Sequence, residues 1–250
     1  MVILKTAREL TAMRNAGRIS SRALREAGKA VEPGVSTLEI DTIIREYIEK
    51  QGATPSFLGY GGFPASACIS VNNVVIHGIP SKKIILKRGD IVSIDVGAYF
   101  EGYHGDNAWT FACGDVSEKA QALMNATREA LFEGIKQAKP GARVGDIGST
   151  VQKYVEARSY SVVRDFVGHG VGAKLHEDPS VPNYGTPGHG VRLLPGMVIA
   201  IEPMVNCGTY KVKVLDDKWT TVTADGELSA HFEHTVAITP DGPVIMTLPD

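Results

Sequence analysis

The strongest constraint on the fold of this 250-residue chain is an internal repeat. Residues 23–34 and 130–141 share the pattern ALxExxKxxxPG, and the same displacement aligns residues 89–95 with residues 196–202. A repeat this long indicates that one structural plan is used twice. The predicted organisation is a single catalytic domain, residues 1–250, with an internal duplication at approximately 15–112 and 120–240.

Each half is predicted to contain two helices followed by strands, which makes the fold class α+β. Apolar residues of segment 123–131 recur at helical spacing, and a Pro-Gly pair ends the first helix of each half. The second helices are predicted over residues 35–51 and 142–159. Runs of β-branched and aromatic residues predict strands at residues 91–96, 108–112, 198–201 and 234–238.

Composition argues against several classes of function. The chain has 26 basic and 28 acidic residues and a net charge of -2, so no nucleic-acid partner is expected. We expect no signal peptide and no membrane span, because no segment approaches about 20 apolar residues. The three cysteines, Cys68, Cys113 and Cys207, are far apart and form no CxxC pair. This spacing argues against a disulfide framework or a thiolate zinc site and favours a cytoplasmic location.

Four carboxylates fall at related positions of the two halves. Asp95 and Glu202 are repeat partners, while Asp106 and Glu233 each follow a histidine by two residues. The spacing from Asp95 to Asp106, across a Glu-Gly turn, is typical of a hairpin, so we expect these two side chains to face each other across the ladder. If the halves pack about a pseudo-twofold axis, all four carboxylates meet in one site.

Four buried carboxylates need cations, because an unpaired buried charge costs several kcal/mol or takes up a proton. A single acid of this kind is usually a solvated strand end, but acids embedded in apolar strands are not explained that way. Two divalent ions would balance the charge, with Asp106 and Glu233 bridging and Asp95 and Glu202 terminal. His169, between two glycines, is the fifth candidate ligand. This donor set suits Mn²⁺, Fe²⁺ or Co²⁺, with Zn²⁺ as an alternative.

These residues resemble one family over essentially the whole chain, the type I methionine aminopeptidases. The resemblance implies the pita-bread fold, in which two pseudo-symmetric α+β halves form a central curved antiparallel sheet flanked by helices. It also implies the same five metal ligands. The motifs that carry it are HGIP at 77–80, IDV at 94–96, GD at 105–106, GHGVG at 168–172, LHE at 175–177, IEPM at 201–204 and FEHT at 232–235.

The implied activity is removal of N-terminal methionine before a small second residue. In the implied mechanism, a hydroxide bridging the metals attacks the first peptide carbonyl. Glu202 would be general base as well as ligand, His176 would hydrogen-bond the scissile peptide, and His77 would assist positioning or proton transfer. Outside these motifs, a lone histidine is more often structural.

The resemblance further implies a methionine pocket and a monovalent cation site for Na⁺ or K⁺. Three pocket positions depart from the family's commonest residues, namely Phe57, Phe63 and Leu175, which affects the shape of the pocket. The same aromatic residues taken alone would usually be core. The pocket would be lined by Phe57, Tyr60, Phe63, Cys68, His77, Leu175, His176 and Trp219, and the cation would lie at Asn72, Val74 and Ser229.

Two alternative functions share the fold. An aminopeptidase P or prolidase-like enzyme has the same metal site but cuts before proline, and such relatives usually carry an additional N-terminal domain. A catalytically inactive peptide-binding module would usually have lost metal ligands, whereas all five candidates are present here. The resemblance favours an enzyme acting as a monomer on N-terminal methionine peptides and on nascent chains at the ribosome.

Overall fold

The computed structural model describes residues 1–248. The helices are α1 (Ala7–Lys29), α2 (Thr37–Lys50), α3 (Glu118–Gln137) and α4 (Val144–Glu156), with a 3-10 turn η1 at Tyr60–Gly62. The strands of the first half are β1 (Thr54–Pro55), β2 (Ala67–Val71), β3 (Val74–Ile76), β4 (Ile91–Phe100) and β5 (Tyr103–Ala112). Those that follow α4 are β6 (Ser161–Val162), β7 (Gly168–Gly170), β8 (Glu177–Val181), β9 (Val198–Ile201), β10 (Met204–Asn206), β11 (Val212–Val214), β12 (Thr221–Thr223), β13 (Ser229–His231), β14 (His234–Thr239) and β15 (Gly242–Ile245).

Helix starts are fixed by capping groups. The Thr6 hydroxyl accepts from the backbone N–H of Glu9, whose carboxylate accepts from Thr6 in return, and Ser36 and Glu39 form the same box at α2. Both second helices, α2 and α4, lie inside their predicted ranges of 35–51 and 142–159. Residue Gly34, after α1, has φ 95°, a left-handed conformation that glycine adopts without strain.

Two antiparallel sheets, one from each half, carry the fold. In the first sheet, β4 pairs with β1 and β2 on one edge and with β5 on the other. In the second sheet the order is β15-β14-β9-β7-β8. The β9–β14 pair is antiparallel, like the β4–β5 pair. Backbone hydrogen bonds in both directions between Ala108 and Glu233 join the two sheets.

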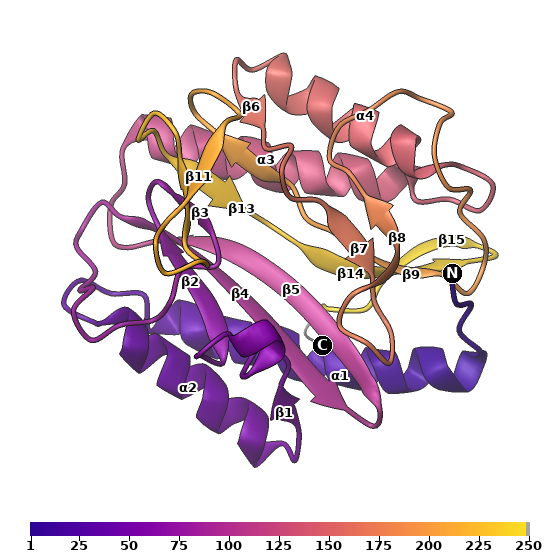
Figure 1. The fold of residues 1–250 in the computed structure, drawn as a ribbon, viewed down its shortest axis with the longest axis horizontal. Coiled ribbons are helices and arrows are strands. Elements are labelled where there is room, and N and C mark those ends of the chain that lie inside the picture. The colour runs from indigo at the N-terminus through magenta and orange to yellow at the C-terminus, as the bar shows by residue number, and fades with distance from the viewer. Residues whose placement is uncertain (249–250) are drawn as a thin grey trace.

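Each half-sheet is covered by its own helix pair (Figure 1): α1 and α2 lie below the first sheet in this view, and α3 and α4 lie above the second. In the first half, Ile40, Ile44 and Ile48 of α2 are fully buried in a cluster with Val92 and Ile94 of β4. Because β4 side chains alternate, Ile94 faces the helices and Asp95 faces the other side of the sheet.

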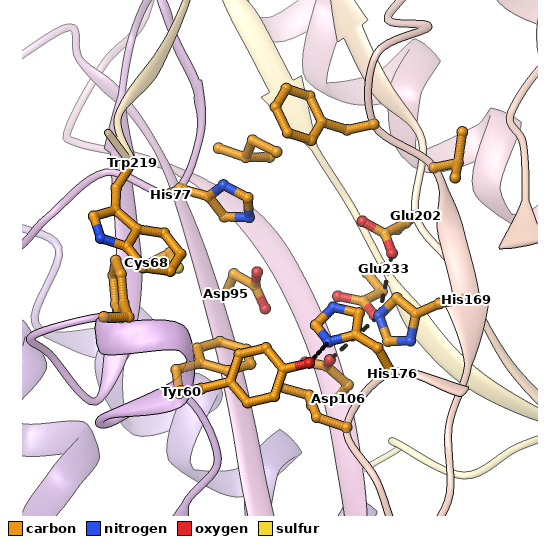
Figure 2. Close-up of a pocket in the computed structure, with 16 residues that line it drawn as sticks. Tyr60, Cys68, His77, Asp95, Asp106, His169, His176, Glu202, Trp219 and Glu233 are labelled. Atoms are coloured by element: carbon orange, nitrogen blue, oxygen red, sulfur yellow. Dashed lines mark hydrogen bonds and ion pairs between the residues drawn. The ribbon is translucent and has the colours of Figure 1, made fainter. Parts of the chain in front are cut away.

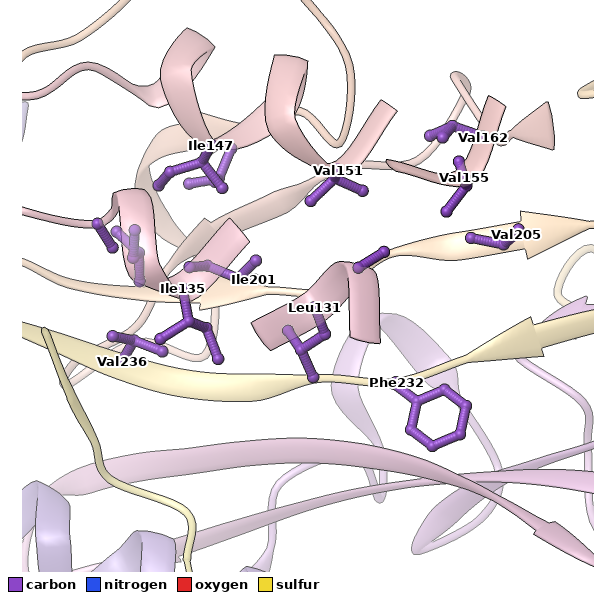
Figure 3. Packing of buried hydrophobic residues seen from close by; sticks show 14 of the residues in the cluster. Leu131, Ile135, Ile147, Val151, Val155, Val162, Ile201, Val205, Phe232 and Val236 are labelled. Carbon is purple, nitrogen blue, oxygen red and sulfur yellow. The ribbon is translucent and has the colours of Figure 1, made fainter. Parts of the chain in front are cut away.

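The second half has an equivalent core between α3, α4 and the strands. Figure 3 shows Leu131 and Ile135 of α3 with Val151 of α4, and Ile201 of β9 with Val236 of β14. Ile201 is completely buried, and its neighbour Glu202 lies at the strand end. No helix within residues 1–248 is long and apolar enough to cross a membrane.

Candidate metal centre

Three of the four carboxylates lie in one row across the joined sheets. Asp95 is opposite Ala108 in the β4–β5 pair, and Ala108 is opposite Glu233. Ile201 is opposite His234 in the β9–β14 pair, so Glu202 follows next to Glu233. Asp106 is opposite Gly97, two residues farther along the same face of β5. The expectation that Asp95 and Asp106 directly face each other is therefore wrong in register, although both side chains share one face.

His169 approaches these carboxylates from β7. Its Nε2 lies 3.5 Å from Glu202 Oε1 and 3.8 Å from Asp106 Oδ2. Its Nδ1 lies 2.9 Å from the carbonyl oxygen of Gly170. Since a carbonyl oxygen only accepts, Nδ1 carries the proton and the Nε2 lone pair faces the carboxylates, as in metal-binding histidines. Burial lowers the pKa of His169 to about 3, which keeps the ring neutral.

The two glycines beside His169 permit close packing of strands. A Cβ at Gly168 would lie 2.3 Å from the carbonyl oxygen of Ala200, and a Cβ at Gly170 would lie 2.3 Å from that of Asp178. These glycines let β7 fit closely between its neighbours, which places His169 at the site.

The cluster is electrostatically unfavourable without cations. Burial raises the pKa of Asp106 to about 7, and burial together with repulsion from Asp106 raises the pKa values of Asp95, Glu202 and Glu233 well above their usual range. One oxygen each of Asp95, Asp106 and Glu233 is buried without a hydrogen-bond partner among the described residues. Ligand atoms of Asp106, His169 and Glu233 all lie within 4.8 Å of one another. This oxygen-rich set with one neutral imidazole fits divalent metal ions.

The carboxylates form one side of a cavity of about 260 Å³. Figure 2 shows Tyr60 and Trp219 on the wall across from Glu202 and His169. Within this cavity the structure brings together every candidate metal, catalytic and methionine-pocket residue of the sequence analysis. They are Phe57, Tyr60, Phe63, Cys68, His77, Asp95, Asp106, His169, Leu175, His176, Glu202, Trp219 and Glu233.

Two histidines outside the carboxylate row also line the cavity. The His176 ring lies 4.1 Å from the His169 ring, and its Nδ1 is 2.8 Å from the Tyr60 hydroxyl. His77 packs edge-on against Phe166 and Trp219 at ring distances of 5.6 and 6.1 Å. Burial lowers the pKa of both rings, to about 4 for His77. Both are therefore neutral at pH 7 and able to act as hydrogen-bonding groups.

The methionine-pocket wall is apolar. Phe57, Phe63, Cys68 and Leu175 form a buried cluster, and Trp219 packs against it with its ring 5.1 Å from that of Phe63. Burial, followed by repulsion from nearby carboxylates, raises the pKa of the Cys68 thiol well above its usual value. The thiol is therefore uncharged, which makes it a poor nucleophile.

Sequence reasoning missed some residues of the site. His231 Nε2 lies 3.8 Å from Glu202 Oε2, and the ring is buried. Its position two residues before Glu233 would have placed it near the same face by strand alternation. Phe166, which contacts His77, lies outside any regular element, and we find no sequence signal for it. Ile76 and Val167 also line the cavity.

The residues predicted to bind a monovalent cation come from adjacent segments. The backbone N–H of Ser229 donates to the carbonyl oxygen of Asn72 at 2.9 Å, and Val74 begins β3. Both ends of the Asn72 side-chain amide already make hydrogen bonds within the protein: the NH₂ group donates to Asp90, and the oxygen accepts from the Ile91 N–H. Cation binding here stays a prediction.

Comparison with known proteins places this architecture in a family. The model of metallopeptidase family M24 matches residues 11–240. A methionine aminopeptidase of Clostridium perfringens is 57% identical over 248 residues, covering 99% of each chain. The crystal structure of methionine aminopeptidase from Thermotoga maritima matches with a TM-score of 0.97 at 48% identity, covering 99% of each chain. The prolidase of Pyrococcus horikoshii OT3 matches with a TM-score of 0.79 at 27% identity, over all of this chain but 65% of that one.

The fold and the site thus define a metal-dependent hydrolase. The chain belongs to metallopeptidase family M24. The family model matches residues 11–240, and the methionine aminopeptidases above match 99% of the chain. The predicted α+β pita-bread fold and the resemblance to methionine aminopeptidases are both confirmed.

Proposed function

We propose that this protein is a dinuclear-metal aminopeptidase that removes N-terminal methionine before a small second residue. The observation that carries the proposal is one cavity in which two buried carboxylates, two partly buried carboxylates and a neutral imidazole lie beside an aromatic, sulfur-containing wall. A thioether makes favourable contacts with aromatic rings. Selectivity for methionine is further supported by the 57% identity to a methionine aminopeptidase.

The proposed ligands are Asp95, Asp106, His169, Glu202 and Glu233. Divalent ions held there would supply Lewis acidity, activate water and bind the free α-amino group of the substrate. We infer two ions from the balance with four carboxylates. Mn²⁺, Fe²⁺ and Co²⁺ are favoured over Zn²⁺ by the oxygen-rich donors.

Glu202 is the proposed general base, because its carboxylate lies within the cluster, with Oε1 3.5 Å from His169 Nε2, and lines the cavity. His176 is proposed to donate to the scissile peptide. The Tyr60 hydroxyl, 2.8 Å from His176 Nδ1, can donate to that nitrogen and leave the proton on Nε2. His77 lies at the far wall, beside Phe166 and Trp219, where it is placed to contact the substrate.

Cleavage before proline is the alternative within the same fold. It is favoured less, because the prolidase match has 27% identity whereas the methionine aminopeptidase match has 57%. The retention of all five candidate ligands also argues against an inactive peptide-binding module. We extend the proposal to nascent chains at the ribosome as substrates, a cytoplasmic location and a monomeric state.

A peptide panel tests the proposed function. We expect hydrolysis of Met-Ala-Ser by protein supplied separately with Mn²⁺, Fe²⁺ or Co²⁺, and little hydrolysis of Met-Phe-Ser, whose bulky second residue serves as the matched control. Ala-Pro tests the proline-specific alternative. Preferential cleavage of Ala-Pro would replace the proposal with prolidase activity, and no turnover with any of the metals would support the inactive module. Elemental analysis of protein purified anaerobically identifies the bound metal.

A further inference from the structure

A second cavity lies on the opposite face of the joined sheets from the metal centre. Asn107 directly follows Asp106, and His234 directly follows Glu233, so strand alternation turns both side chains away from the carboxylates. They enter a cavity of about 260 Å³ between α1, β5 and α3. Its walls are almost wholly apolar and include Leu24, Trp109, Phe111 and Phe132.

Asn107 and His234 form a cross-strand pair. Ala108 and Glu233 exchange both backbone hydrogen bonds, so the adjacent pair, Asn107 with His234, is a non-hydrogen-bonded one. Side chains of such a pair have Cβ atoms about 4.5–5.5 Å apart. The next non-hydrogen-bonded pair on that face is Trp109 with Phe232, whose rings lie 4.8 Å apart. The Asn107 and His234 side chains thus lie next to each other, beside a pair of aromatic rings.

Both polar groups are buried and incompletely satisfied. Asn107 is 2% exposed and His234 is 5% exposed. Asn107 Oδ1 and His234 Nε2 have no hydrogen-bond partner within residues 1–248. A buried polar atom without a hydrogen-bond partner costs free energy. Such atoms in a cavity therefore indicate a bound group that supplies the missing hydrogen bonds.

Asn107 Oδ1 is an acceptor, and the role of His234 Nε2 is assigned from the contacts of Thr247. The Thr247 hydroxyl oxygen accepts from the Thr235 N–H at 3.2 Å and lies 2.9 Å from His234 Nδ1. Because the Thr247 oxygen already accepts from the Thr235 N–H, we assign its hydroxyl proton to the bond with His234 Nδ1 and the ring proton of His234 to Nε2. The cavity therefore offers one N–H donor next to one carbonyl acceptor.

We propose that this cavity binds a small, neutral, planar heteroaromatic bicycle that presents an N–H next to an acceptor nitrogen. The N–H would donate to Asn107 Oδ1, and the ring nitrogen would accept from His234 Nε2. An apolar cavity of about 150 Å³ holds benzene, so the larger volume here, about 260 Å³, accommodates a second ring. Trp109, Phe111 and Phe132 would contact the ring faces and edges.

The probe for this site is 7-azaindole, whose ring edge carries the required N–H and nitrogen. Indene, which has a similar shape but lacks both nitrogens, is the matched control. We expect calorimetry on the metal-free protein to show at least about tenfold tighter binding of 7-azaindole, since two hydrogen bonds add to the shared apolar contacts. A co-crystal structure should place 7-azaindole between Asn107 and His234.

Two variants distinguish the hydrogen bond to Asn107 from non-specific apolar binding. Asn107→Leu should reduce the affinity for 7-azaindole to about that for indene, whereas Lys139→Gln, at an exposed residue that does not line the cavity, should leave it unchanged. If Asn107→Leu does not fold, the comparison of the two probes on the unmodified protein still decides. Equal affinities for both probes, binding of 7-azaindole only beside the carboxylates, or no binding up to its solubility limit would overturn the proposal.

Discussion

At the residue scale, Glu202 has a distinct neighbour on each carboxylate oxygen. Oε1 lies 3.5 Å from His169 Nε2, and Oε2 lies 3.8 Å from His231 Nε2. One oxygen can therefore contribute to metal binding with His169 while the other remains near a second imidazole. His231 is buried, and burial lowers its pKa to about 3, so it is present as a neutral ring beside Glu202.

The variant Glu202→Gln tests this dual role. The amide has nearly the same shape but binds no proton at neutral pH and is a weaker metal ligand, so we expect kcat on Met-Ala-Ser to fall by about 10²- to 10⁴-fold. The control is Glu156→Gln at the exposed end of α4, which should leave kcat unchanged. Metal content measured by elemental analysis separates lost binding from lost proton transfer. Turnover near the unmodified level would eliminate Glu202 as the base.

The four candidate carboxylates could be grouped from sequence because Asp95 and Glu202 are repeat partners, and because Asp106 and Glu233 each follow a histidine by two residues. Their exact pairing was predicted wrongly although the predicted Glu101-Gly102 turn is present, because a two-residue turn at that place pairs Phe100 with Tyr103. Asp95 therefore faces Ala108 and not Asp106. Phe166 was missed for a different reason: a residue from an irregular segment reaches the cavity only through tertiary packing.

At the element scale, the predicted strands were correct in place but too short at the site. The prediction began the second strand at residue 108, whereas β5 begins at Tyr103. Residues 104–107 are His-Gly-Asp-Asn, types that include some of the poorest strand formers. Here the functional polar residues oppose local propensity, and pairing with β4 overrides it.

A buried ion pair connects the segment before α1 to the loop that carries His176. Lys5 Nζ donates to Glu177 Oε2 at 2.6 Å, and the two side chains are 2% and 5% exposed. Glu177 Oε1 also accepts from the backbone N–H of Lys174 at 3.2 Å. The pair thus holds the residues on either side of Leu175 and His176 against the N-terminal segment.

Removing only one partner of this pair should be costly. We expect Lys5→Met to lower the free energy of unfolding by about 3–5 kcal/mol, because it leaves the Glu177 charge buried without its partner. The double variant Lys5→Met/Glu177→Gln should recover much of that loss. Urea denaturation measures the free energy of unfolding of the metal-free unmodified protein, of each single variant and of the double variant. If the double variant is as unstable as the sum of the two single variants, the ion pair does not explain the effect.

At the scale of the whole molecule, the candidate metal centre lies where the two half-sheets meet. Asp95 and Asp106 come from the first half, whereas His169, Glu202 and Glu233 come from the second. Backbone hydrogen bonds between Ala108 and Glu233 already join the halves at this point. Ions shared by ligands from both halves would therefore cross-link them, and any ligand that binds only the folded state adds to its stability.

Metal removal should accordingly destabilise the protein, and more strongly at high pH. Asp106, with its pKa raised to about 7 from 3.8, binds a proton in the folded metal-free state where the unfolded chain does not. The stability of the metal-free protein should thus fall as the pH rises from about 4 to about 7. Mn²⁺ replaces those protons, and it binds more tightly as the ligands deprotonate.

We therefore expect the difference in Tm between Mn²⁺-loaded and chelated protein to be larger at pH 8 than at pH 6. Each Tm is measured by calorimetry at both pH values. Taking the difference at each pH largely cancels the titration of histidines in the unfolded chain, which is common to both samples. The variant Asp106→Asn is the internal control: it removes the titrating group and a candidate ligand together, so both the Mn²⁺ stabilisation and its increase with pH should diminish. A Tm difference that is the same at both pH values would mean that the carboxylates do not couple proton release to metal binding.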